Sequence, residues 1–197
     1  MQILGIDVGF GFTKAYDGVN NIIFNSVMGD ATAIQFQTSL GSDDPNEKIH
    51  ITFDGEELFI GNYAQRQSHI TDYTLDQDKL IERFVKVMTV TAAGLCSAST
   101  EPINVVTGLP VGFMKRDSGR LKKIIRGHHE ISFHKTGQSS ETRKIYIDKV
   151  AVIPQPIGSI FHLIFDEFGK VKDHSLSRKK LGVVDIGFKT TDYSIFD

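Results

Sequence analysis

The 197-residue sequence contains a single cysteine, Cys96. One thiol excludes both an intramolecular disulfide and a zinc site built from several cysteines. Such low cysteine usage is typical of reducing compartments, and we therefore expect a cytoplasmic protein. Because Cys96 lies within an apolar stretch, its side chain is expected in the hydrophobic core.

The sequence also lacks long apolar runs and an excess of charge of either sign. It has no run of about 18 apolar residues and does not begin like a secretion signal, so no membrane association is expected. The 22 basic and 24 acidic residues leave a net charge of -2. Strong direct binding to nucleic acid is therefore not expected, because phosphate affinity depends on many basic side chains. The 40% of apolar and 23% of charged residues are typical of a globular protein.

Apolar periodicity divides the chain into strand-like and helix-like segments. Alternating patterns between glycine-containing turns predict an N-terminal antiparallel meander and a hairpin that turns at Asp54–Gly55. A β-rich part also follows the second helix, up to about residue 153. The other expected strands are 2–8, 11–16, 21–28 and 104–109, the hairpin covers 49–60, and the expected helices are 76–96, 113–126 and 156–168.

Two of these helices have apolar side chains at helical spacing. In helix 76–96, Thr74 and Gln77 form a capping-box pattern at the start. The apolar face of this helix comprises Ile81, Phe84, Val85, Met88, Ala92 and Leu95. In helix 156–168, the spacing of Phe161, Phe165 and Phe168 predicts that all three are core residues.

A polar stretch, GKVKDHSLSRKK, precedes the last apolar segments. This composition predicts a linker between domains. We therefore expect a first domain over residues 1–168, a linker over 169–180 and the first strands of a second domain over 181–197. The last segment is too short to complete a domain.

Two turns of the sequence share one pattern. The stretches GIDVGFGFTK and VVDIGFKTTDY each place Asp, Gly, Phe and Thr at the same spacing after an apolar strand. The matching pairs are Asp7 and Asp185, Gly9 and Gly187, Phe10 and Phe188, and Thr13 and Thr191. From average residue frequencies, two such copies in one chain have a chance on the order of one in a thousand.

A nucleoside triphosphate requires backbone N–H groups for its phosphates, small residues for close approach and carboxylates for hydrated Mg²⁺. Each turn contains these groups. The alternative is that both are ordinary hairpin turns, in which Asp and Gly are common for conformational reasons. The repetition favours phosphate binding. Because the chain lacks Gly-x-x-x-x-Gly-Lys-Ser/Thr and a full dinucleotide fingerprint, the expected loop is of the hairpin type.

These turns, together with the phrases VVTGLPVGFMKRD and VIPQPIGS, resemble the actin-like ATPase superfamily of actin, heat-shock chaperones and sugar kinases. The nearest likeness is to plasmid-segregation actin-like proteins of the ParM/StbA type. The resemblance implies an α/β fold, the ribonuclease-H-like domain with a mixed five-stranded sheet, flanking helices and an N-terminal antiparallel meander. The first hairpin of a second domain would follow. The resemblance covers only the first half of the family.

The resemblance also implies roles for individual residues. Asp7 and Asp185 would hold Mg²⁺, with Asp185 also acting in catalysis, and Gln155 would orient the water that attacks the γ-phosphate. The residues expected to contact ATP or GTP are Asp7, Gly9, Phe10, Gly11, Phe12, Thr13, Lys14, Gly187, Phe188, Lys189, Thr190 and Thr191. For Gln155 the alternative is a helix-entry amide, and for Lys189 it is a side chain that contacts only solvent.

The implied function is ATP hydrolysis coupled to filament assembly in plasmid or DNA segregation, with copies of the protein and a DNA-binding adaptor as partners. One alternative is a nucleotide-sensing scaffold. Another is a small-molecule kinase of the same superfamily, which requires a carboxylate base where Gln155 stands. Because the family's adenosine-binding motif is not in these residues, the isolated chain is expected to be inactive as an ATPase.

Residues 115–149 contain ten Lys or Arg and four Asp or Glu, a local net charge of +6. We interpret this segment as a solvent-exposed face, with a filament or adaptor contact as the alternative. The pair His128 and His129 has no further ligands at suitable spacing, so no metal is assigned to it.

Overall fold

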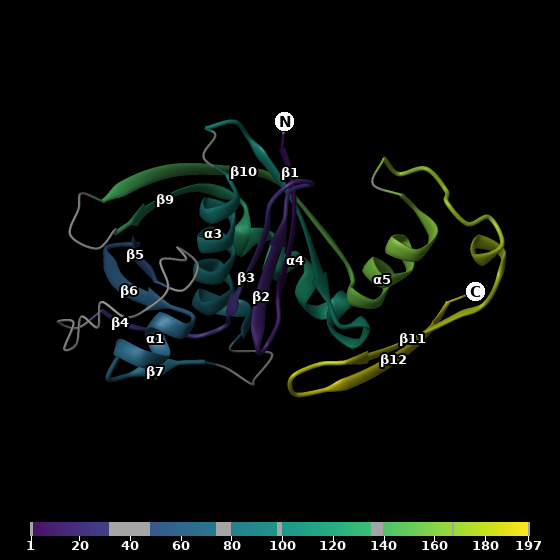
Figure 1. Cartoon of the computed structure of the whole chain (residues 1–197), viewed down its shortest axis with the longest axis horizontal. Coiled ribbons are helices and arrows are strands. Elements are labelled where there is room, and N and C mark those ends of the chain that lie inside the picture. Colours follow the sequence, from purple (N-terminus) through teal and green to yellow (C-terminus); the bar gives the residue numbers. More distant parts are fainter. Residues whose placement is uncertain are drawn as a thin grey trace.

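The computed structural model describes residues 2–31, 48–73, 80–97, 100–134, 140–166 and 168–196. Within these ranges, ten strands form one sheet in the order β3-β2-β1-β8-β10-β9-β5-β6-β4-β7, and β11 and β12 form a separate hairpin. Figure 1 shows helix α3 inside the curve of the large sheet, with α5 and the hairpin on the other side of β1–β3.

The elements have the following bounds. The strands of the large sheet are β1 (Gln2–Val8), β2 (Phe12–Tyr16), β3 (Asn21–Asn25), β4 (Met28–Asp30), β5 (Ile49–Phe53), β6 (Glu56–Ile60), β7 (Thr71–Asp72), β8 (Ile103–Leu109), β9 (Gly127–Phe133) and β10 (Glu141–Pro154). The helices are α1 (Asn62–Gln67), the π-helical turn η1 (Leu80–Phe84), α3 (Val85–Cys96), the 3-10 turn η2 (Val111–Phe113), α4 (Met114–Ile125), α5 (Gln155–Ile164) and the 3-10 turn η3 (Leu176–Arg178).

The first five strands of the order, β3-β2-β1-β8-β10, form the mixed sheet that the resemblance predicted. Strand β1 is antiparallel to β2 and parallel to β8, and β10 is parallel to β8. Strand β3 is antiparallel to β2, so the N-terminal meander is confirmed. Because parallel strands end at the same edge of a sheet, the C-terminal ends of β1, β8 and β10 lie next to one another.

The sheet extends further than the five strands expected. Strand β10 has 14 residues, and its first half pairs with β9 while its second half pairs with β8. The register shifts between Ile147 and Lys149, where the strand changes partners. The predicted hairpin of β5 and β6 then pairs with β9, and its turn has the expected positive φ values at Asp54 (50°) and Gly55 (80°).

Helix α3 is buried on almost every side, whereas the sequence pattern predicted one buried face. Val87, Met88 and Val90 are all completely buried, although they point in different directions around the helix. The reason is that α3 contacts β1, β2 and β3 on one side and β9 and β10 on another. The capping pair Thr74 and Gln77 lies outside the described residues.

The core position predicted for Cys96 is confirmed. Its side chain is 7% exposed at the end of α3, and burial raises the pKa of its thiol to about 11. The thiol is therefore protonated at neutral pH, which fits a packing role. No helix among the described residues is long and apolar enough to cross a membrane.

Helix α5 ends at Ile164, four residues before the predicted end. Phe165 adopts an extended conformation and forms an isolated bridge with Val171. The prediction of three core phenylalanines was wrong for two of them, since Phe161 is 51% exposed and Phe168 is 78% exposed. Among the described residues, α5 packs on β8, β10, β11 and η3, and its buried residues, Pro156, Ile160 and Ile164, lie on one face.

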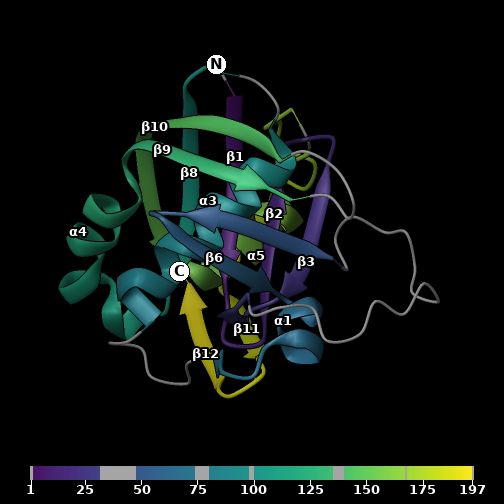
Figure 2. The same ribbon diagram turned by 90° about the vertical axis from the view of Figure 1, so that its left-hand side faces the viewer.

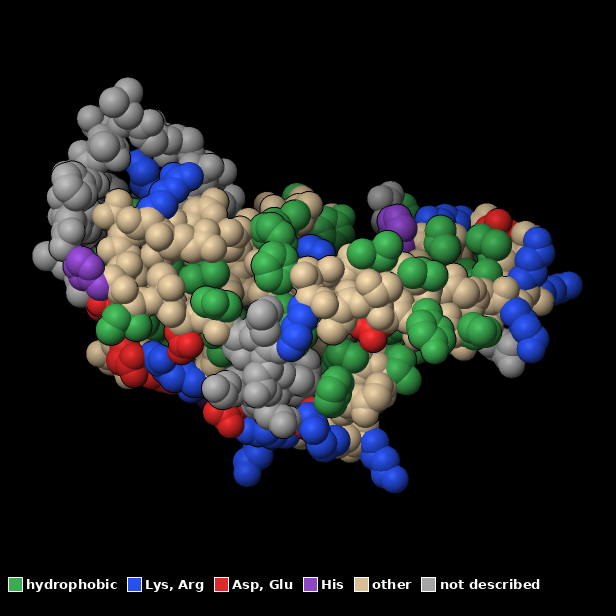
Figure 3. Space-filling model, turned by 90° about the horizontal axis from the view of Figure 1, so that it is seen from below, with side chains coloured by type: hydrophobic (Ala, Val, Ile, Leu, Met, Phe, Trp, Pro, Cys, Tyr) green, Lys and Arg blue, Asp and Glu red, His purple; other side chains and the backbone are tan. Residues whose placement is uncertain are grey.

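Strands β11 (Leu181–Ile186) and β12 (Thr191–Phe196) pair only with each other among the described residues. Strand β11 contacts α5, and the hairpin runs below this helix in Figure 1. Several large apolar side chains of the hairpin are exposed, namely Val184, Ile186, Phe188, Tyr193 and Ile195. Figure 3 shows hydrophobic side chains spread over this end of the molecule. We expect them to be covered by another chain, by the first domain or by a further part of the protein, because exposed apolar strands are prone to pairing.

The central position of β1 leads to a stability prediction. Leu4 is completely buried in β1, whereas Leu163 of α5 is 50% exposed, so the two leucines form a matched pair. We expect Leu4→Ala to lower the free energy of unfolding by about 2–5 kcal/mol, because it leaves a cavity in the core. Leu163→Ala should change it by about 0.5 kcal/mol or less. Urea denaturation followed by circular dichroism measures both, and equal effects would contradict the described core.

Candidate functional site

The first turn connects β1 to β2 at the C-terminal end of β1. The Gly9 N–H donates a hydrogen bond to the carbonyl oxygen of Phe12 at 3.0 Å, which closes a tight hairpin turn. A β-carbon at Gly9 would lie 3.0 Å from the same oxygen, so a side chain here would crowd the turn. The carbonyl of Gly11 accepts a hydrogen bond from the Ser26 N–H at 2.9 Å, which holds the turn against the chain that follows β3.

The second turn has the same geometry between β11 and β12. The Gly187 N–H donates to the carbonyl oxygen of Thr190 at 2.8 Å. A β-carbon at Gly187 would lie 3.2 Å from that oxygen. The Thr190 hydroxyl donates to a carboxylate oxygen of Asp192 at 3.2 Å. The two stretches with equal sequence spacing therefore fold into equivalent hairpin turns.

The two turns contact each other. A β-carbon at Gly11 would lie 2.8 Å from Cγ of Phe188, so the backbone of the first turn lies directly against the aromatic ring of the second. Conversely, the Lys189 Nζ lies 5.1 Å from the ring centroid of Phe10, within the range of a cation–π interaction. Glycine at position 11 therefore permits the close approach of the two turns.

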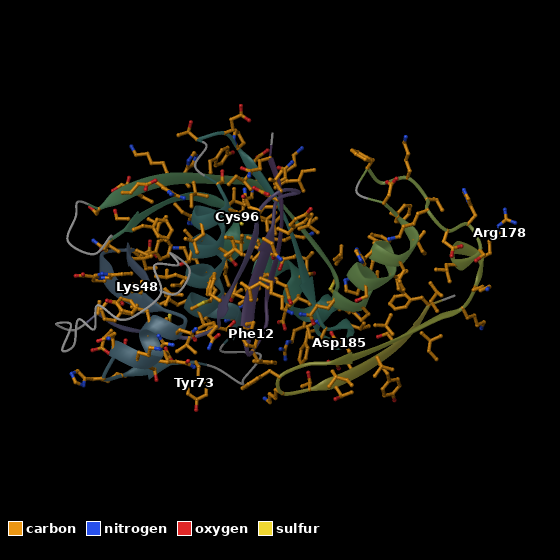
Figure 4. All side chains as sticks on the ribbon, in the orientation of Figure 1. Phe12, Lys48, Tyr73, Cys96, Arg178 and Asp185 are labelled. Carbon is orange, nitrogen blue, oxygen red and sulfur yellow. The ribbon has the colours of Figure 1, made fainter. Side chains whose placement is uncertain are left out.

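A cleft lies between the turns and the adjoining strand ends. It consists of two neighbouring hollows of about 470 Å³ and about 460 Å³. Both hollows are lined by Asp7, Lys14, Gly108, Gln155 and Asp185. Figure 4 labels Phe12 at the start of β2 and Asp185 in β11, and both residues line the hollow between the turns.

Gln155 reaches the cleft because it is the first residue of α5, immediately after β10. Its Nε2 donates a hydrogen bond to Oδ1 of Asp7 at 3.2 Å. A β-carbon at Gly108 would lie 2.6 Å from Cγ of Gln155, so any other residue at the end of β8 would displace the glutamine. The cleft is thus formed where three neighbouring strands end, by Asp7 of β1, Gly108 of β8 and Gln155, which directly follows β10.

Asp7 carries the main electrostatic feature of the cleft. Burial raises the pKa of its carboxyl above the ordinary value of 3.8, and the charge of Asp185 acts in the same direction. Lys14 and the hydrogen bond from Gln155 lower the pKa but do not cancel the effect of burial. A carboxylate that is poorly solvated and close to another one favours a bound cation, which would offset both costs.

Most of the predicted site residues line this cleft, but two do not. The side chain of Thr13 is completely buried, and its hydroxyl is hydrogen-bonded to that of Ser26 at 2.9 Å. Alternation along β2 directs Thr13 into the core while Lys14 faces the cleft, so Thr13 cannot offer its hydroxyl to a phosphate. Thr191 begins β12 and is also not among the lining residues. The other predicted residues of both turns line the hollow between them.

Sequence reasoning missed the contribution of β8. Gly108 lines both hollows, and Pro110 lines the one between the turns. The phrase VVTGLP contains both residues, but its strand was not connected with the site. The parallel pairing of β8 with β1, which the sequence does not reveal, places Gly108 at the level of Asp7.

The sequence model of a family described as actin-like proteins, N-terminal domain, matches residues 5–158. The chain belongs to this actin-like family. No curated protein gave a significant match. The actin-like assignment agrees with the mixed sheet and with the position of the two turns.

The solved structures that are similar to this actin-like chain include the following three. The apo psk41 ParM protein has 22% identity and a TM-score of 0.78 over 99% of this chain and 61% of its own. A 15-stranded ParM filament from Clostridium botulinum has 26% identity and a TM-score of 0.78 over 99% of this chain and 58% of its own. The archaeal actin homologue Ta0583 in complex with ADP has 18% identity and a TM-score of 0.77 over 100% of this chain and 56% of its own. The chain thus spans about three-fifths of the length of the structures that it matches.

The raised pKa of Asp7 leads to a prediction about pH. A carboxyl whose pKa is higher in the folded than in the unfolded state destabilises the fold once it is ionised, so stability falls as pH rises above the unfolded value of 3.8. Asp7→Asn removes this ionisation and keeps an acceptor for Gln155. We expect the variant to be more stable than the parent chain at pH 7 and equally stable below about pH 3.8. Urea denaturation across this pH range tests the prediction, and a less stable variant at pH 7 would contradict it.

Proposed function

We propose that the chain is the first part of a ParM-type actin-like protein that binds ATP or GTP with Mg²⁺ and hydrolyses it during filament assembly. The observation that carries the proposal is the pair of equivalent hairpin turns on opposite sides of one cleft. Asp7, Asp185 and Gln155 all line the same cleft. Two similar proteins were solved as a ParM filament and as an ADP complex, which supports self-association and nucleotide binding.

The residues of the cleft fit a hydrated Mg²⁺ with phosphates. Asp7 and Asp185 line both hollows from opposite elements, and carboxylates are the protein ligands that Mg²⁺ prefers. When bound, the ion would neutralise negative charge on the phosphates. Gly9, Gly11 and Gly187 would let the phosphates approach the backbone, while Lys14 and Lys189 add positive charge.

Gln155 is proposed to orient the attacking water. Phosphoryl transfer depends mainly on positioning, and an uncharged amide can both accept from and donate to a water molecule. The Gln155 amide donates a hydrogen bond to Asp7 in the cleft, and α5 has no side-chain cap hydrogen bond at its start. This geometry supports the water-orienting role over the helix-entry alternative.

The two alternative functions are less well supported. A small-molecule kinase requires a carboxylate base where Gln155 stands, and the other acid of the second turn, Asp192, is hydrogen-bonded to Thr190. A nucleotide-sensing scaffold would use the same cleft without hydrolysis. A measurement of nucleotide hydrolysis distinguishes this scaffold from the filament protein, because only the filament protein is expected to release phosphate.

The segment 115–149 supports the interpretation of a solvent-exposed face. Several of its arginines are already paired with acids, as shown by the ion pairs Arg116–Asp117, Arg120–Glu82, Arg126–Asp148 and Arg143–Glu141. Asp117 is itself buried, whereas the Arg120–Glu82 and Arg126–Asp148 pairs are more exposed. Exposed pairs contribute little to stability and are common on protein surfaces. We therefore propose that any DNA cargo in plasmid segregation is contacted through a separate adaptor protein.

Filament assembly leads to a direct prediction. Because the chain spans about three-fifths of its relatives, the test uses the full-length protein that contains it. We expect the protein to pellet on ultracentrifugation with Mg²⁺ and ATP and to remain in the supernatant without nucleotide. Asp7→Ala should abolish pelleting because it removes a cleft carboxylate, while Asp148→Asn, on the surface next to Arg126, should not. No nucleotide-dependent pelleting by the parent protein would rule out the proposal.

The role of Gln155 can be tested separately. We expect Gln155→Ala in the full-length protein to reduce steady-state phosphate release by about 100-fold, the scale of positioned proton-transfer and water-orienting groups. Nucleotide affinity, measured by fluorescence titration with a labelled ATP analogue, should change far less. His162→Ala on the exposed side of α5 is the matched control and should leave phosphate release unchanged. Normal turnover in Gln155→Ala would assign the residue to helix entry.

A further inference from the structure

A second cluster of polar side chains lies outside the nucleotide cleft. It consists of His50 from β5, Glu57 from β6 and His134, which directly follows β9. The potential ligand atoms of these side chains all lie within 4.8 Å of one another. None of the three residues lines the cleft described above. In the linear sequence, only the adjacent residues His128 and His129 stood out as possible metal ligands.

Strand pairing explains why these side chains meet. His50 faces Phe59 across the β5–β6 hairpin, and Thr52 faces Glu57. Strand β5 also pairs with β9, and the His134 N–H donates a hydrogen bond to the carbonyl oxygen of His50 at 2.8 Å. Because alternate residues of a strand share a face, the three side chains project from the same face of the sheet. Figure 2 shows β9, β5 and β6 side by side.

The His128–His129 pair is arranged differently. The His128 ring stacks on Tyr146 with a centroid distance of 4.2 Å, while Nε2 of His129 lies 2.7 Å from the carbonyl oxygen of Ile125. Adjacent residues of a strand point to opposite faces, so these two imidazoles cannot bind one ion together. His50, Glu57 and His134 come from three neighbouring chain segments, so their side chains can meet at one point, unlike those of the adjacent pair.

Distances within the cluster suit a small divalent cation. Nε2 of His50 lies 2.6 Å from Oε1 of Glu57, and the rings of His50 and His134 have a centroid distance of 4.4 Å. In a tetrahedral zinc site with bonds of about 2.0–2.2 Å, neighbouring donor atoms lie roughly 3.3–3.6 Å apart. This separation falls between the 2.6 Å of the His50–Glu57 pair and the 4.8 Å limit of the whole cluster. Small side-chain rotations would bring all three donors into coordination, and the His50–Glu57 hydrogen bond would be replaced by two bonds to the ion.

The surroundings hold the imidazoles in place. The His50 side chain is 17% exposed, and its ring packs edge-on against the buried Phe59 at a centroid distance of 4.7 Å. The Thr52 hydroxyl lies 2.7 Å from Nε2 of His134, which fixes the second ring. Such preorganisation reduces the cost of ordering ligands around an ion.

We propose that His50, Glu57 and His134 form a Zn²⁺ site that fastens the β5–β6 hairpin to the end of β9. Two imidazole nitrogens and one carboxylate are a donor set suited to zinc, whereas Mg²⁺ prefers oxygen ligands only. Three protein ligands leave a coordination position for water. The site is independent of the nucleotide cleft, so neither proposal depends on the other.

The first experiment measures zinc binding by the tag-free chain after treatment with a chelator. Equilibrium dialysis against Zn²⁺ in the presence of excess Mg²⁺, followed by elemental analysis, should find one zinc per chain. Zinc should also raise the thermal unfolding midpoint, because it binds only the folded state. Co²⁺ should give the intense visible absorption of a four-coordinate site. Absence of bound zinc, or a Co²⁺ spectrum of the six-coordinate type, would overturn the proposal.

The second experiment uses variants with a matched control. His50→Gln, Glu57→Gln and His134→Gln should each weaken zinc binding by at least about tenfold, since loss of even an outer-shell partner costs about 10- to 100-fold. His128→Gln, on β9 but outside the cluster, should bind zinc like the parent chain. Far-ultraviolet circular dichroism identifies variants that fail to fold. If a variant fails to fold, the Co²⁺ spectrum of the parent chain decides whether a four-coordinate metal site is present. Equal loss in His128→Gln, or no loss in the other three, would refute the assignment.

Discussion

The candidate site depends above all on the parallel pairing of β1, β8 and β10. Ile6 pairs with Thr107, and Gly108 pairs with Ile153, so the three strands end at the same level. Residues 7, 108 and 155 are far apart in the sequence, but this register places them at one edge of the sheet. A shift of one residue in either pairing would turn the side chains to opposite faces and separate Asp7 from Gln155.

The same alternation of side chains divides the neighbouring residues between core and cleft. In β2, Thr13 is buried beside Ser26, while Lys14 points into the cleft. The sequence motif contains both, and only the pleat of the strand decides which one can meet a ligand. A motif therefore identifies a turn more reliably than it identifies the side chains that act there.

The hairpin β11–β12 brings the second turn to the first. Among the described residues, it pairs with no strand of the large sheet. Several of its large apolar side chains are exposed to solvent. The contact between Phe188 and Gly11 and the position of Lys189 over Phe10 join the two turns directly.

The sequence by itself determined the N-terminal meander, the Asp54–Gly55 hairpin and the two equivalent turns, because each depends on local backbone preferences and short-range periodicity. Its resemblance to actin-like proteins was enough to indicate the family. Only the tertiary structure decided the extension of the sheet beyond β10, the burial of α3 on almost every side and the exposure of Phe161. These features depend on which distant strands cover a given face. The convergence of His50, Glu57 and His134 is of the same kind, since it results from pairing between three strands and leaves no pattern in the linear sequence.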